Sequence, residues 1–318
     1  MPRIVLGTGG FEGLSGKVGR AAMLAALKMG YRGIDTSEMN RNLIDIRWAC
    51  QRAGVDRKDL FLVLKIPPWS HGYDGVLQSF RRQTSQLRLD YVDLVLIQWP
   101  HVWSLEQRDW GPAQWSKANQ TKASMRRESW KAMEELFNSG RARAIGVSNH
   151  TIDDMEAILQ GCAVPPMVMQ GESHPHWPNR PVRDWCRKHE IIFQGYAPFG
   201  GQETDQNSGH RAVDDDVVHS VATRNGLTPF QVCMQWNQAR NSSTVVKSKN
   251  ILHLRENLAA CNQRLCAAAD LGRIDERAKE FLKYGPCYWG HNDMDYMHPW
   301  KDEEKMLESM FSDGALEA

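Results

Sequence analysis

Short apolar runs alternate with longer segments of helical periodicity from residue 4 to about residue 258. Several of the runs are almost continuous in apolar residues, which is typical of parallel strands covered on both faces. The pattern predicts eight strands: IVLGT (4–8), YRGID (31–35), LFLVLK (60–65), YVDLVLI (91–97), ARAIGV (142–147), PMVMQ (166–170), IIFQGY (191–196) and STVVK (243–247).

The segments between these runs have the spacing of amphipathic helices. One helix is predicted over Val18–Met29, with Gly30 as its C-cap, and another over Ser129–Asn138, with Gly140 just beyond its end. Strand and helix alternate eight times along the chain. This alternation predicts an α/β fold in which eight parallel strands close into a (β/α)8 TIM barrel ringed by helices.

A dinucleotide-binding Rossmann unit is the competing interpretation of the N-terminal segment. The stretch LGTGGFEG follows the first predicted strand and precedes a helix, and Asp35 ends the next strand. However, Gly7, Gly9 and Gly13 give the spacing GxGxxxG, and an isolated glycine pattern is weak evidence. The eightfold alternation accounts for far more of the chain, so the barrel is favoured.

Two regions lie outside the repeat. Residues 101–124 form a long polar segment with three tryptophans, which we expect to be a binding loop or lid. Residues 1–260 are predicted to form the barrel. Residues 261–318 are predicted to add a helix, an aromatic-rich loop and an acidic tail that pack on the barrel, so that the chain is a single domain.

Composition narrows the classes of partner. The net charge of the 318-residue chain is +1, which gives no electrostatic reason to expect nucleic acid or an anionic membrane as a partner. No apolar stretch approaches the length of a membrane span. Seven cysteines without a CxxC pair are typical of a reducing compartment. We therefore expect a cytoplasmic protein, or an organellar one if a transit peptide precedes this numbering.

Polar residues end most of the predicted strands, although each run before them is apolar. In a TIM barrel the active site is built at these carboxyl ends. A single buried polar group is often structural, but a ring of them that converges on one mouth is difficult to explain by packing alone. The residues at these ends are Asp35, Lys65, Gln98, Ser148, Asn149, Gln170, Tyr196 and Lys247.

At these residues the chain resembles the aldo-keto reductases. The resemblance extends over nearly the whole sequence and depends on several motifs that occur in the family's order. These motifs are GYRGIDTS, DRKDLFLVLK, LDYVDLVLIQWP, SWKAMEELFNSGRARAIGVSNH, QGESHPHWPN, GYAPFG, GLTPFQVCMQW and VVKSKNILHLREN.

The resemblance implies NADP(H) as the cofactor, extended across the barrel mouth. It implies that Ser148, Asn149 and Gln170 bind the nicotinamide carboxamide and that Tyr196 stacks on the ring. For the adenosine end it implies Lys247 and Ser248 at the 2′-phosphate, His253 where the family often has arginine, and Glu256 and Asn257 near adenine. The charge of Lys247 favours NADP(H) over NAD(H).

The sequence departs from the family at the catalytic residues. Aldo-keto reductases use an aspartate, a tyrosine that donates the proton, a lysine and a histidine. Asp35 and Lys65 match this pattern, but Asn40 occupies the tyrosine position and Gln98 the histidine position. Amides donate hydrogen bonds to an oxyanion but cannot release a proton. The loss of a general acid typically costs about 10²–10⁴ in rate.

Three functions remain open from this pattern. The chain could reduce acceptors that need little proton assistance, such as quinones, with Asn40 and Gln98 as a hydrogen-bonding cradle. It could use a relocated proton donor, for which His101, Glu38 and Lys65 are candidates. It could also bind NADP(H) without turnover, as a regulatory or scaffold subunit. We favour an oxidoreductase that acts on a small aromatic or apolar carbonyl or quinone.

No metal site is expected. His174 and His176 form an HxH pair without a nearby third ligand in the sequence, which is weak evidence for a metal. Tryptophans near the predicted mouth either line an aromatic substrate pocket or anchor loops, and these are Trp69, Trp99, Trp103, Trp177 and Trp289.

Overall fold

The computed structural model describes residues 1–10, 13–102, 123–200, 211–262 and 266–280. Its strands form a closed barrel in which every neighbouring pair is parallel, including β1 with β8. This confirms the predicted (β/α)8 TIM barrel. The strands are β1 Ile4–Gly7, β2 Gly33–Asp35, β3 Phe61–Ile66, β4 Leu94–Ile97, β5 Ile145–Ser148, β6 Val168–Glu172, β7 Ile192–Tyr196 and β8 Ser243–Val246.

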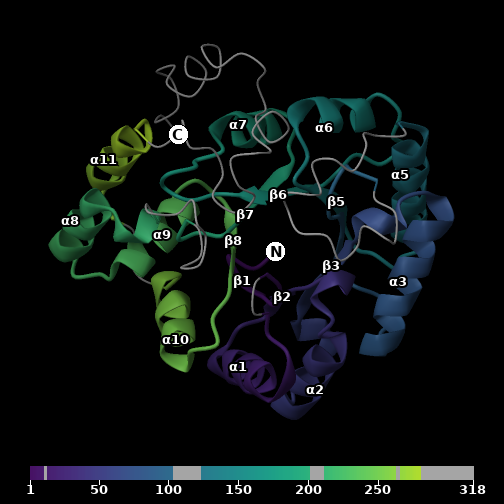
Figure 1. Cartoon of the computed structure of the whole chain (residues 1–318), viewed down its shortest axis with the longest axis horizontal. Coiled ribbons are helices and arrows are strands. Elements are labelled where there is room, and N and C mark those ends of the chain that lie inside the picture. The colour runs from purple at the N-terminus through teal and green to yellow at the C-terminus, as the bar shows by residue number, and fades with distance from the viewer. Residues whose placement is uncertain (11–12, 103–122, 201–210, 263–265, 281–318) are drawn as a thin grey trace.

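Helices ring the strands (Figure 1), because each connection between parallel strands must cross back over the sheet. The main hydrophobic core lies between the outer face of the barrel and these helices. Within the described residues the helices are α1 Gly16–Met29, α2 Leu43–Ala53, α3 Tyr73–Leu87, α5 Ala123–Asn138, α6 Ile152–Leu159, α7 Arg180–Lys188, α8 Asp216–Asn225, α9 Pro229–Gln238, α10 Ile251–Ala260 and α11 Ala268–Ala278.

Local sequence signals set several helix ends. Gly30 closes α1 in the left-handed conformation with φ 111°, and its N–H bonds back to the carbonyls of Ala26 and Leu27. Thr151 begins α6 and Thr228 begins α9, each with a capping box that satisfies the first free N–H groups. None of the helices in the described ranges is long and apolar enough to cross a membrane.

Two predicted helices begin earlier than their apolar stripes suggested. α1 starts at Gly16, and α5 starts at Ala123, where its first turns, ASMRRE, are exposed or half-buried and so lie outside the buried stripe. The last two residues of the loop predicted over 101–124 are therefore helical, and residues 103–122 lie outside the described residues. α11 packs beside α8 around a second, smaller core (Figure 1).

Candidate active site

The barrel interior changes from apolar to polar toward the carboxyl ends of the strands. Val63, Leu94, Leu96 and Val168 form a separate buried cluster. Because β3 and β6 are not neighbours in the sheet, their side chains meet only across the interior. Side chains alternate along a strand. The residues two positions further along β3, β4 and β6 therefore face the same interior near its mouth, and these are Lys65, Gln98 and Gln170.

Asp35 and Lys65 form a buried ion pair at this level. The Lys65 ammonium donates to Asp35 Oδ1, and the two residues are 9% and 3% exposed. Gln170 Nε2 donates to the other carboxylate oxygen, Oδ2, at 2.8 Å. Opposite charges in contact, with a further donor on the carboxylate, compensate for the loss of water around both groups.

Gln170 is held in one orientation by two acceptors. Its Nε2 also donates to Gln194 Oε1 at 2.6 Å, so both amide hydrogens are used and Gln170 Oε1 is left as an acceptor. Gln194 in turn donates to Ser243 Oγ at 3.2 Å. Sequence reasoning missed Gln194, although its position two residues before Tyr196 places it on the same strand face.

The residues predicted to contact nicotinamide lie side by side at the exits of β5, β6 and β7. Ser148 is paired in register with Gln170, and the Asn149 N–H donates to the Gln170 carbonyl at 2.9 Å. Tyr196 Oη donates to Asn149 Oδ1 at 2.8 Å. Asn149 Nδ2 donates to the Gln98 carbonyl at 3.0 Å, which ties this group to β4.

Asn40 lies at the end of a short 3-10 helix, Glu38–Asn40, and its amide turns toward the exit of β1. It contacts the Ser37 hydroxyl at 3.1 Å, and with the amide oxygen facing the backbone it accepts from the N–H groups of Gly9 and Ser37, both at 3.3 Å. Asn40 makes no hydrogen bond to Lys65. The role of Asn40 as part of a hydrogen-bonding cradle for a substrate oxygen stays a prediction.

Gln98 is the residue at the family's histidine position. Its backbone is engaged on both sides, with its N–H donating to the Ile66 carbonyl at 3.0 Å. Its side-chain amide, however, makes no hydrogen bond with any described residue, and its Oε1 is buried without a partner. A buried polar atom without a partner is uncommon in native proteins and indicates a place where a ligand can bind.

A family model for the aldo/keto reductases matches residues 3–279 of the chain. The chain belongs to the aldo/keto reductase family. It is 34% identical over 263 residues to deoxymugineic acid synthase 1 of Zea mays, covering 81% of this chain and 82% of that protein. It is 32% identical over 266 residues to the NADP(+) glycerol 2-dehydrogenase of Hypocrea jecorina, covering 81% and 83%.

A solved structure of aldo-keto reductase AKR2E5, a protein of the silkworm Bombyx mori, in complex with NADPH superimposes with a TM-score of 0.77. The two sequences are 27% identical, and the match covers 87% of this chain and 84% of that one. A structure from Brucella melitensis, also an aldo/keto reductase, superimposes with a TM-score of 0.74 at 26% identity, covering 87% and 95%.

The sequence of this aldo/keto reductase offers three candidates for a relocated proton donor. Their surroundings in the structure differ. Glu38 turns away from the mouth to α3, where it accepts from Ser79 Oγ at 2.6 Å and from Arg82 at 3.0 Å. The charged groups that act on His101 are Asp154 of α6 and Arg126 of α5, and burial lowers the pKa of His101 to about 4. Only Lys65 of the three lies in the barrel interior.

Two further histidines lie near His101 at the exits of β3 and β5. His71 bridges the Trp99 carbonyl and the Ser129 hydroxyl, each at 2.9 Å, and burial lowers its pKa to about 4. His150 donates from Nδ1 to the Ser148 carbonyl at 2.8 Å, and burial likewise lowers its pKa to about 4. Both rings are therefore neutral at pH 7.

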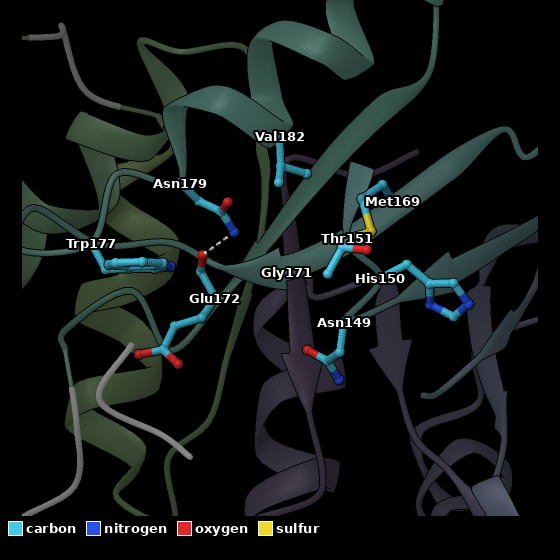
Figure 2. Close-up of a pocket in the computed structure, with 9 residues that line it drawn as sticks. All are labelled: Asn149, His150, Thr151, Met169, Gly171, Glu172, Trp177, Asn179 and Val182. Atoms are coloured by element: carbon cyan, nitrogen blue, oxygen red, sulfur yellow. Dashed lines mark hydrogen bonds between the residues drawn. The ribbon is translucent and has the colours of Figure 1, made fainter. Parts of the chain in front are cut away.

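A small pocket with about 20 Å³ of free space, enough for a water molecule, lies between β5, β6 and α7. Figure 2 shows Asn149, His150 and Thr151 on one side of it and Trp177 and Asn179 on the other. The buried Glu172 lies on the same side as Trp177 and Asn179, and the remaining lining residues are Met169, Gly171 and Val182.

The HxH pair makes separate contacts with two carboxylates. His174 Nε2 contacts Glu172 at 3.0 Å, and His176 Nε2 contacts Asp215 at 3.3 Å. Throughout the described ranges, no group of three His, Cys, Asp or Glu side chains is arranged to hold a metal ion. Trp99 and Trp177 are buried, and Trp177 lines the small pocket, whereas Trp103 and Trp289 lie outside the described residues.

The residues predicted for the adenosine end gather after β8. Lys247 is half-buried, and Ser248 Oγ accepts from the Asn250 N–H at 3.0 Å at the start of α10. His253 stacks on Phe230 with the ring centroids 6.0 Å apart. Glu256 accepts from Thr228, and Asn257 is buried on α10.

The residues at the mouth fit a nicotinamide. A carboxamide offers one acceptor and two hydrogens. Gln170 Oε1 accepts no hydrogen bond from the described residues, and Asn149 has one amide hydrogen that none of them uses, so the two groups complement that pattern. The Tyr196 ring is held by its hydroxyl bond to Asn149. When bound, the cofactor would supply hydride.

Proposed function

We propose that this aldo/keto reductase is an NADP(H)-dependent oxidoreductase that reduces a small carbonyl or quinone-like acceptor with weakened general acid catalysis. The observation that carries the proposal is the link between two groups of residues. Asp35, Lys65 and Gln170 form one hydrogen-bonded group, Asn149 and Tyr196 the other, and the β5–β6 pairing joins them.

In this proposal Ser148, Asn149, Gln170 and Tyr196 hold the nicotinamide, while Lys247, Ser248, His253 and Glu256 hold the adenosine phosphate end. Lys65 carries the positive charge nearest the reacting oxygen and stabilises an oxyanion there. The amide of Gln98 adds a hydrogen bond. Asn40 acts only indirectly, by shaping the exit of β1.

The absence of a tyrosine at the proton-donor position favours substrates that need little proton assistance. Without a tyrosine hydroxyl over Lys65, an acceptor that stabilises its own negative charge has an advantage. The loss corresponds to about 3–5 kcal/mol of barrier for an ordinary aldehyde. Quinones and other electron-poor carbonyls lose less. The names of the relatives, which include dehydrogenases and reductases of small molecules, support a small-molecule substrate.

The second candidate is a subunit that binds NADP(H) without turnover. It is favoured by one observation, namely that the amide of Asn40 is directed to Gly9 and Ser37 and leaves Lys65 without a second partner. Protein partners for such a role are not predicted by any feature of the sequence. The cytoplasmic location stays a prediction from the unpaired cysteines.

Two measurements together separate the candidates. NADPH binding is followed by quenching of tryptophan fluorescence, and NADPH oxidation is followed with a panel of aldehydes, ketones and quinones. Binding with turnover of at least one acceptor class supports the oxidoreductase. Tight binding with no turnover on any acceptor supports the binding subunit, and the absence of binding contradicts both.

A further inference from the structure

Among the described residues, the mouth of the barrel holds several hydrogen-bond donors, and Lys65 is the one proton-donor candidate that lies in its interior. Lys65 donates to Asp35 and to no other described residue, so two of its three N–H groups are available. Glu38 is engaged with α3, where it accepts from Arg82. A second source of the proton is the substrate itself.

Gln98 is placed to form hydrogen bonds with a substrate that has a hydroxyl next to its carbonyl. It lies two residues beyond Leu96, whose Cα is paired with that of Lys65, so the two side chains are diagonal neighbours on the interior face, about 8 Å apart at Cα. The Gln98 amide carries both a donor and an acceptor, and neither is used by a described residue.

The buried Oε1 of Gln98 is an acceptor in need of a donor. Leaving it without a hydrogen bond costs free energy, and the terminal torsion of glutamine is soft. A small rotation therefore lets a ligand hydroxyl satisfy it. A ligand with a carbonyl alone would satisfy Lys65 and the amide hydrogens but would leave this acceptor buried and unpaired.

We propose that the substrate class is a carbonyl with an acidic hydroxyl next to it, as in an ortho-hydroxy aromatic aldehyde or a hydroxyquinone. Lys65 binds the carbonyl oxygen, and Gln98 binds the hydroxyl and carbonyl edge at two points. This inference depends on the proposed function, whose dihydronicotinamide is the reductant.

The neighbouring hydroxyl also supplies the missing proton. When the carbonyl carbon accepts hydride, the π electron pair moves to the carbonyl oxygen. The adjacent hydroxyl then gives up its hydrogen bond to Gln98 Oε1 and transfers its proton to that oxygen, while the Gln98 amide N–H donates to the phenolate. The phenolate that remains recovers a proton from water. One dihydronicotinamide and one proton are consumed for each carbonyl converted to an alcohol, and Lys65 stays protonated throughout.

The test compares 2-hydroxybenzaldehyde with 4-hydroxybenzaldehyde, which have the same atoms but differ in where the hydroxyl lies. 2-Methoxybenzaldehyde controls for bulk at the ortho position. Binding is measured by calorimetry with the protein saturated in NADP+, where no reduction occurs. The 2-hydroxy compound is expected to bind about tenfold more tightly than either control. In Gln98→Leu and in Gln98→Met the three dissociation constants should converge.

Rates of NADPH oxidation with the same aldehydes distinguish a failure of the substrate-class inference from a failure of the proposed function. A preference for the 2-hydroxy compound that Gln98→Leu abolishes supports the inference. Turnover of all three at similar rates, with equal affinities, overturns the inference and leaves the proposed function standing. If NADP+ does not bind, or if NADPH is oxidised with no acceptor at all, the proposed function fails and the inference fails with it.

Discussion

The Asn40 amide lies directly over the Cα of Gly9. An ideal Cβ on Gly9 would come within 2.4 Å of Asn40 Oδ1, closer than side-chain atoms approach one another. A side chain on Gly9 would therefore displace the amide of Asn40, which stands where the family's proton donor is expected. Lys65 has Asp35 as its hydrogen-bond partner.

Gly9→Ala should destabilise the protein by about 1–2 kcal/mol, because Asn40 must move and lose its hydrogen bonds to the backbone. Gly161→Ala is the matched control, since a Cβ there meets nothing within 4 Å. The double variant Gly9→Ala with Asn40→Ala should lose less stability than the sum of the single variants. Additive free energies of unfolding would contradict the contact.

Restoring the family's tyrosine and histidine should restore general acid catalysis. The double variant Asn40→Tyr with Gln98→His is expected to raise kcat/KM for a simple aldehyde by about 10²–10⁴. The rate should then show the ionisation of a tyrosine paired with Lys65. The measurement is steady-state NADPH oxidation over a range of pH. An unchanged rate in a folded variant would mean that the loss of these two groups does not limit the reaction.

Gln194→Leu should weaken dinucleotide binding indirectly, through Gln170. It removes the acceptor that fixes one hydrogen of Gln170, so the Gln170 amide is no longer held by two partners. We expect the dissociation constant for NADPH to rise about tenfold, as for the loss of one hydrogen bond. Gln235→Leu in α9, whose side chain accepts from the Cys266 N–H and makes no hydrogen bond with the described residues proposed to hold the cofactor, is the control for a general loss of stability.

Lys247→Ala should weaken NADPH more than NADH, by about tenfold, because only NADPH carries the 2′-phosphate. His253→Arg should act in the opposite direction by returning a fixed cation to the position where the family often has one. Both affinities follow from tryptophan fluorescence titration. Equal effects of Lys247→Ala on the two dinucleotides would place the phosphate elsewhere.

Acid should destabilise the fold through its buried neutral histidines. Burial lowers the pKa of His71 and of His150 to about 4, so between about pH 6.5 and pH 4 the unfolded chain binds more protons than the native state. The free energy of unfolding should therefore fall as the pH drops through this window, by up to about 1.4 kcal/mol per pH unit for each histidine. The stability of His150→Phe should depend less steeply on pH, as measured by urea unfolding. An identical slope would contradict the assignment.

The sequence predicted the barrel because its signal is repeated eight times, and the strand ends followed from the same repeat. The grouping of Ser148, Asn149, Gln170 and Tyr196 at the mouth was predictable for a similar reason, since all four end apolar runs, and their binding of nicotinamide stays a prediction. The resemblance to the family then gave these residues their roles. Each was a local signal, readable without any knowledge of distant contacts.

The sequence could not show in which direction each side chain points. The pattern placed Asn40 at the tyrosine position but not the turn of its amide toward Gly9, which depends on a contact between residues 31 positions apart in the chain. The partners of Glu38 are likewise set by its contact with Arg82 of α3, 44 positions further along the chain. Gln194 was missed because it lies inside an apolar run and not at its end.

The central claim is that the groups for hydride transfer are in place while the proton donor is missing. It is tested most directly by NADPH oxidation with 1,4-naphthoquinone and with benzaldehyde, side by side at saturating NADPH and corrected for the reaction without protein. The account predicts that the quinone is reduced at least about tenfold faster, because it needs less proton assistance. Equal rates, or faster reduction of benzaldehyde, would contradict it.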